Sequence, residues 1–131
     1  MFFNQFPDHE VYNSQTISLA QLKNINGKWN YVINSDEKLI VGKSGQFPGG
    51  GHIDLSNGQP IKAAGEVKIV NGQLKYIDNS SGHYLPSGLS ARQIAEETFS
   101  KLGLDTLNKY IEKEWIEDPT IRNGGAWRPN L

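Results

Sequence analysis

Residues 62–79, KAAGEVKIVNGQLKYIDN, decide the fold of this chain because they contain its clearest β-hairpin. Two runs with strand-like composition flank Asn71-Gly72, the dipeptide that most favours a two-residue type I′ turn. Side chains alternate between the two faces of a sheet, so the turn sets which residues share a face. The core face of this hairpin is expected to carry Val67, Ile69, Leu74 and Tyr76.

The opposite face of the hairpin is charged. It is expected to carry Glu66, Lys68 and Lys75, with the two lysines directly opposite each other. Like charges in that position repel, which indicates either a solvated outer face or a bound anion. Lys68 and Lys75 are therefore candidate phosphate-binding residues.

A second hairpin is predicted upstream. KWNYVIN (28–34) alternates large apolar residues with asparagine, SDE turns the chain, and KLIVG (38–42) follows. SLAQLKNI (18–25) has the length of a short helix, and HIDL (52–55) is at most a short strand. The two hairpins together predict one antiparallel sheet.

Two helices are predicted after the hairpins. ARQIAEETFSKL (91–102) is preceded by a capping box of Ser90 and Gln93 and followed by Gly103 as a C-terminal cap. Asp105 could cap a second helix that ends before Asp118-Pro119. Its buried face would consist of Leu107, Tyr110, Ile111 and Trp115.

These elements predict an α+β fold, in which a twisted antiparallel sheet of hairpins carries two C-terminal helices on one face. The expected organisation is an N-terminal strap or linker (1–27), a catalytic domain (28–118) and a C-terminal tail (119–131). A length of 131 residues fits such a single domain.

Composition limits the function classes. The formal charge is −1, so no global basic field favours nucleic acid, and nucleic-acid binding would need a local patch. Without cysteine there is no disulfide, thiolate metal site or cysteine nucleophile. Neither a secretion signal nor an apolar run long enough to span a membrane is evident, so no membrane partner is expected.

Histidines in glycine-rich loops are the strongest candidates for chemistry. His52 and His83 flank the hairpin that carries Glu66, and such a set can move protons near neutral pH. Tyr84 adds a donor and a stacking face, and Ser81 adds a hydroxyl. Asp54 shares one side of HIDL with His52, but two ligands at no recognisable spacing are weak evidence for a metal, so neither metal nor cofactor is expected.

The chain resembles C-terminal toxin domains of bacterial polymorphic toxin systems, of the Rhs and contact-dependent inhibition type. The resemblance runs from Lys28 to Trp115 and is carried by GKWNYVI, LIVG, GHIDLSNGQPIKAAGEVKIVNGQLKYIDNSSGHYLPSG and KYIEKEW. It implies a monomeric ribonuclease toxin, released from a larger secreted carrier. It also implies action in the cytoplasm of a target bacterium and neutralisation by a cognate immunity protein.

A metal-independent ribonuclease is the favoured function. In it His52 and His83 exchange protons, Glu66 is base or orienting group, and Tyr84 completes the catalytic set. Lys68, Lys75, Ser81 and Asp54 would contact the RNA substrate. Two alternatives remain open: an ADP-ribosyltransferase toxin that uses NAD with His52, Tyr84 and Glu66 or Glu97, and a non-catalytic binding module.

Overall fold

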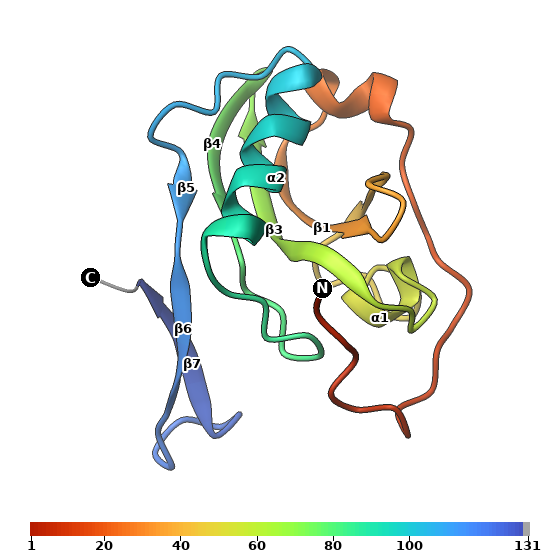
Figure 1. The fold of residues 1–131 in the computed structure, drawn as a ribbon, viewed down its shortest axis with the longest axis vertical. Coiled ribbons are helices and arrows are strands. Elements are labelled where there is room, and N and C mark those ends of the chain that lie inside the picture. Colours follow the sequence, from red (N-terminus) through yellow and green to blue (C-terminus); the bar gives the residue numbers. More distant parts are fainter. Residues whose placement is uncertain (130–131) are drawn as a thin grey trace.

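The fold is described by a computed structural model for residues 1–129, and it is an α+β arrangement around one five-stranded sheet (Figure 1). The sheet order is β2-β1-β3-β4-β5, antiparallel except for the parallel pair β4–β5. The α+β class and the antiparallel hairpins predicted from the sequence are confirmed. The strands are β1 Gly27–Asn34, β2 Leu39–Lys43, β3 Ile61–Val70, β4 Gln73–Asp78 and β5 Tyr110–Ile111.

One long helix, α2 (Leu89–Lys101), covers one face of the sheet (Figure 1). The small side chains of Ala91 and Ala95 at its buried positions let the helix approach the strands closely, and Phe99 meets the Tyr31 ring edge-on at 5.3 Å between centroids. The main core lies between helix and sheet. It includes Tyr31, Ile33, Val41, Val67, Ile69, Leu74, Ile77, Ala91, Ala95 and Phe99.

The other face of the sheet is covered by a short helix, α1 (His52–Leu55), and by the loop after β4. A second, smaller core lies there. It consists of Val32, Ile53, Leu55, Ile61, Ala64 and Tyr84. The prediction of a short strand at HIDL is therefore wrong, since four residues are too few for periodicity to separate a helix turn from a strand.

A β-bulge changes the register of the β3–β4 hairpin. Ile69 faces Leu74 as predicted, but beyond them Lys68 faces Tyr76 and Val67 faces Ile77, which leaves Lys75 without a partner. Ile77 therefore takes the core position expected for Tyr76. The bulge also separates Lys75 from Lys68, and the lysine that does lie opposite Lys68 is Lys28 of β1.

The start of α2 differs from the prediction. Gly88 is the N-cap, and no side chain caps the helix, so the capping box of Ser90 and Gln93 is wrong. Gly103 does follow the helix with a φ of 86°, a left-handed conformation that glycine adopts without strain. The predicted C-terminal cap is confirmed.

The second predicted helix is wrong. Residues 110–117 are extended: β5 pairs with β4, and β6 (Lys113–Glu117) pairs with β7 (Gly125–Pro129). Tyr, Ile and Trp favour strands, and pairing with a distant strand overrides a local spacing of three and four residues. Leu107, expected on a buried helix face, is exposed. The β6–β7 hairpin extends away from the sheet and α2 (Figure 1).

The N-terminal strap runs over the α1 side of the domain and reaches the opposite end of the sheet. Phe2 pairs with Ile61, Gln15 donates to the Gly49 carbonyl, and Ile17 donates to the Val41 carbonyl. The strap then enters a 3₁₀ helix, η1 (Leu19–Asn24), close to the short helix predicted at 18–25. Backbone hydrogen bonds thus fix a segment that has no periodicity of its own.

Candidate functional site

Helix α1 is fixed to the strap through Asp54. Its carboxylate accepts hydrogen bonds from the Tyr12 backbone N–H at 2.8 Å and from the Gly49 backbone N–H at 2.9 Å. Asp54 is buried, so both oxygens satisfy backbone donors that would otherwise be stranded away from water. The carboxylate therefore joins three segments of the fold.

His52 begins the same helix and is buried under it. Its Nε2 lies 2.8 Å from the Gly65 carbonyl oxygen, so this nitrogen carries the proton and donates to the carbonyl. Burial lowers the pKa of His52, because the imidazolium would lose its hydration. The ring is consequently a neutral donor that ties α1 to β3.

Glu66 follows Gly65 in β3 and is half-buried. One carboxylate oxygen accepts from the Ser44 hydroxyl at 3.1 Å and the other from the Tyr76 hydroxyl at 3.3 Å. Partial burial and this carboxylate raise the pKa of Tyr76. Both oxygens of Glu66 thus have protein partners.

A buried ion pair follows at the end of β4. Asp78 is fully buried, and its carboxylate lies 2.8 Å from the Lys113 ammonium of β6. The other oxygen accepts from the Glu66 N–H and from both the N–H and the hydroxyl of Ser80. Next to it, the Asn79 side-chain amide donates to the Lys113 carbonyl and accepts a hydrogen bond from the Lys113 backbone N–H. This network attaches the β6–β7 hairpin to the sheet.

Tyr84 and Ser81 lie inside the loop after β4. The Tyr84 hydroxyl donates to the Gln59 carbonyl at 2.6 Å and lies 2.6 Å from the Ser56 hydroxyl. Its ring is buried in the smaller core. Ser81 is also buried, and its hydroxyl has no hydrogen-bond partner within residues 1–129.

His83 pairs with a histidine from the strap. His83 Nε2 lies 3.1 Å from His9 Nδ1, and Phe6 stacks on the His9 ring with 4.9 Å between centroids. Burial and the neighbouring His9 lower the pKa of His83, while Asp54 acts in the opposite direction. The sequence did not predict this pair, because no local signal links residues 74 positions apart.

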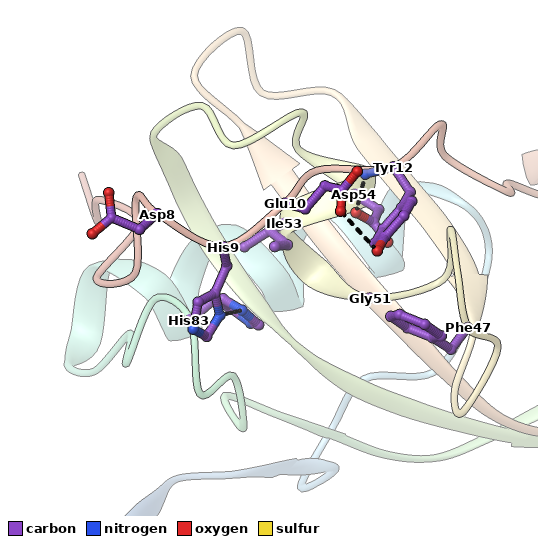
Figure 2. A pocket seen from close by; sticks show the side chains of 9 residues that line it. All are labelled: Asp8, His9, Glu10, Tyr12, Phe47, Gly51, Ile53, Asp54 and His83. Atoms are coloured by element: carbon purple, nitrogen blue, oxygen red, sulfur yellow. Dashed lines mark hydrogen bonds between the residues drawn. The ribbon is translucent and has the colours of Figure 1, made fainter.

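Two cavities meet at this histidine pair. The first, of about 470 Å³, is lined by the strap and α1, and Figure 2 shows His9 and His83 side by side at one end of it, with Tyr12 and Phe47 at the other. Its lining residues are Asp8, His9, Glu10, Tyr12, Phe47, Gly51, Ile53, Asp54 and His83. The second, of about 720 Å³, is a groove between the strap, the loop after β4 and the β6–β7 hairpin.

The groove is mainly apolar and open to solvent. Phe6 is 44% exposed, Leu85 47% and Trp115 38%, which are large fractions for such residues. The complete lining is Phe6, His9, Gly82, His83, Leu85, Trp115 and Asn123. Sequence reasoning missed Phe6 and Leu85, and placed Trp115 on a helix. The aromatic residues of the strap were the available signal.

The predicted site residues thus gather around α1 and β3 but face different surroundings. His52 and Glu66 are near enough for the Glu66 charge to affect the pKa of His52, yet each is bonded to its own partners. Lys68 and Lys75 lie on β3 and β4, and neither forms an ion pair within the part of the chain that the structure describes.

Residues 1–129 contain no group of three His, Asp or Glu side chains arranged to hold a metal ion. Within the same residues, no helix has both the length and the apolar character needed to cross a bilayer.

Three curated plant proteins from Arabidopsis thaliana are similar to this chain. IQ domain-containing protein IQM5 is 27% identical over 129 residues, which covers 95% of this chain. IQM3 is 42% identical over 62 residues and IQM2 is 30% identical over 78, covering 46% and 58% of the chain. The matches span 24%, 13% and 12% of these relatives, so the chain accounts for about a quarter of their length or less. No solved structure matches it.

These relatives overturn the resemblance to bacterial toxins. The expected ribonuclease activity, the RNA and immunity-protein partners, and delivery from a secreted carrier into a target bacterium are wrong, because the relatives are plant IQ domain-containing proteins. The alternative of an ADP-ribosyltransferase toxin that uses NAD is wrong for the same reason, since it also assumed a bacterial toxin.

A family model described as the IQ motif-containing protein middle domain matches residues 5–90, which is well over half of the sequence. The chain therefore belongs to the IQ motif-containing protein middle domain family.

Proposed function

We propose that this chain is a non-catalytic binding module, and that its binding surface is the groove of about 720 Å³ beside the β6–β7 hairpin. The observation that carries the proposal is the convergence of three solvent-exposed apolar side chains, Phe6, Leu85 and Trp115, on one concave surface. Contiguous exposed apolar surface in a concavity is typical of sites where another protein segment binds.

The polar groups that the sequence singled out as catalytic or substrate-binding support a structural role over catalysis. The carboxylates of Asp54 and Glu66, the imidazole of His52 and the hydroxyl of Tyr84 all have protein partners within hydrogen-bond distance. A general acid or base needs an atom that can reach a substrate proton. In our proposal these residues instead hold α1, the strap and the loop after β4 in the positions that shape the groove.

The proposed ligand is a protein segment with apolar side chains. A two-stranded hairpin has little stability of its own, and β6–β7 extends beyond the main sheet (Figure 1). A segment that packs on Trp115 would bury apolar surface and stabilise this hairpin. In this proposal the strap of residues 1–27 and the body of residues 28–118 form most of the groove, and the tail of residues 119–131 contributes Asn123.

Calmodulin is the partner that the IQ domain family suggests. Calmodulin binds amphipathic helices through their apolar faces. Here α2 is the only helix longer than six residues in the described part of the chain, and its apolar residues Ala91, Ala95 and Phe99 are buried in the core. No isoleucine in the sequence is followed directly by glutamine. We propose that any calmodulin contact of the longer relatives lies outside the region matched here.

Isothermal titration of this chain with calcium-loaded calmodulin is therefore expected to show no binding at protein concentrations of about 100 μM, that is, a Kd well above the micromolar range. The physical reason is that α2 would have to leave the core to present an apolar face. Binding at micromolar Kd would contradict this assignment, and its survival in Phe6→Ala and Trp115→Ala would place the contact outside the groove.

The groove itself is tested by selecting peptides from a random display library on the immobilised chain. We expect enriched peptides to carry aliphatic or aromatic residues and to lose at least about tenfold in affinity with Leu85→Asp, because a carboxylate in the groove must be desolvated. Leu107→Asp is the matched control, since Leu107 is also exposed but does not line the groove.

Two outcomes would contradict the proposed function. One is that no peptide is enriched, or that enriched peptides bind equally well to Leu85→Asp and Leu107→Asp. The other is breakdown of total RNA or of labelled NAD by the purified chain with a rate that depends on His52 or His83, because a binding module has no such turnover.

A further inference from the structure

Two histidines fasten the strap to the loop after β4. His9 Nδ1 and His83 Nε2 are 3.1 Å apart, a distance at which one ring donates its N–H to the lone pair of the other. Close by, the Gln5 backbone N–H donates to the His83 carbonyl at 2.7 Å. Phe6 stacks on His9 and meets His83 edge-on at 5.7 Å. Residues 5–9 are thus attached to this loop mainly through His83.

The same two rings separate the two cavities. His9 and His83 are the residues that line both the strap cavity of about 470 Å³ and the groove of about 720 Å³. Figure 2 shows the pair at the end of the strap cavity. Movement of His9 away from His83 would therefore join the two cavities and uncover Ile53, which lines the first.

Protonation decides whether this contact can exist. With no added proton, or with one shared proton, one nitrogen still presents a lone pair to the other, and the hydrogen bond is kept. When both rings are imidazolium, two N–H groups point at each other and two positive charges lie on rings whose centroids are 5.2 Å apart, which is repulsive. A second proton on the pair therefore removes the last lone pair between the rings and breaks the hydrogen bond.

The charged groups around the pair determine the direction of the pH effect. Burial and His9 lower the pKa of His83, and Asp54 of α1 partly opposes them. The strap carboxylates of Asp8 and Glu10 line the same cavity. The result is a lowered pKa of His83 in the closed arrangement, so the contact is fully present above the ordinary histidine pKa of about 6.5 and is lost as pH falls through the lowered value.

We propose that His9 and His83 form a pH-sensitive latch, which holds the strap against the loop while the pair carries at most one added proton and releases residues 5–9 when both rings are protonated. The latch itself does not depend on the proposed function. Only its consequence does, because opening the latch would widen the proposed peptide-binding groove.

Hydrogen exchange of the Gln5 amide, measured on the whole chain at about pH 7.5 and about pH 5, tests the latch directly. Protection factors already correct for the intrinsic pH dependence of exchange. We expect the Gln5 protection factor to fall at least about tenfold at the lower pH, because release of residues 5–9 breaks the hydrogen bond from the Gln5 N–H to the His83 carbonyl. In His9→Gln the fall is expected to disappear, because glutamine can bond His83 but does not titrate in this range.

Asp36→Asn is the control for general effects of acid, since Asp36 lies in the β1–β2 turn and should leave the pH dependence unchanged. Equal Gln5 protection at both pH values in the unmodified chain would overturn the latch, as would an unchanged fall in both His9→Gln and His83→Gln. Peptide binding to the groove at about pH 7.5 is a separate measurement, so its failure would overturn the proposed function and leave the latch result standing.

Discussion

Gly65→Ala is expected to lower the free energy of unfolding by about 3 kcal/mol, the upper end of the usual cost of overpacking. Gly65 lies in the middle of β3, where the end of β4 passes directly over it. A Cβ atom at this position would overlap the Asp78 carbonyl oxygen and lie 2.5 Å from its carbon. These are backbone atoms of a neighbouring strand, so they cannot move aside as a flexible side chain would.

Chemical or thermal unfolding followed by circular dichroism measures this effect. Gly82→Ala is the matched control, because no atom lies within 4 Å of a Cβ built there and its φ is not in the left-handed region. Both substitutions reduce the entropy of the unfolded chain similarly, so their difference isolates the clash. A Gly65→Ala variant as stable as Gly82→Ala would show that β4 does not approach β3 as described.

The role of Gly65 also explains why the motif AAGEV misled the functional interpretation. Its glycine is required by the close approach of Asp78, and its carbonyl accepts the hydrogen bond from His52. In SGHY, Ser81 and Tyr84 are buried. Short motifs that meet packing requirements can occur in unrelated proteins, so the likeness to toxin domains rested on structural residues. The family match covers residues 5–90 and therefore extends well beyond these two short motifs.

Local patterns predicted β1 to β4 well because each lies in a hairpin whose turn and alternation are close in sequence. The β3 and β4 strands and their Asn71-Gly72 turn follow directly from residues 62–79. The bulge at Lys75 has no local signature, since it depends on how β4 must bend to reach β5 and the loop beyond. A strand at residues 110–111 likewise depends on a partner more than thirty residues upstream.

The candidate site was predictable only in part, for the same reason. Glycine-rich loops pointed to His52 and His83 but could not indicate which groups would meet them. The partner of His83 is His9, and the partner of His52 is a backbone carbonyl. Both contacts arise from tertiary packing between segments far apart in sequence. Residue types alone suggested acid–base chemistry, whereas their bonded partners favour structural roles.

Asp78→Ala is expected to lower the free energy of unfolding by about 3–5 kcal/mol, the usual cost of removing one partner of a buried ion pair. Asp78 is fully buried, and the Lys113 side chain is only 20% exposed. The substitution removes the counter-ion of Lys113 and also strands the N–H groups of Glu66 and Ser80, which donate to the same carboxylate. Denaturant unfolding at neutral pH measures the loss.

Glu37→Ala is the matched control, because Glu37 and Lys62 form an ion pair of 3.6 Å at the surface. Such an exposed pair contributes about 0–1 kcal/mol. Should Asp78→Ala fail to fold, Ser80→Ala removes a single hydroxyl donor to Asp78 and is expected to cost about 1 kcal/mol. Equal effects of Asp78→Ala and Glu37→Ala would contradict the buried network.

The Asp78 variant also connects stability to the groove. Lys113 begins β6, and Trp115 lies two residues further along the same strand, so both side chains depend on how the hairpin is attached to the sheet. Loss of the ion pair should therefore raise hydrogen exchange in β6 and β7 more than in β1. It should also weaken peptide binding even when the groove residues are unchanged. Binding that is unaffected in a folded Asp78 variant would mean that other contacts, such as those of Asn79 and the pairing of β5 with β4, hold the hairpin in place.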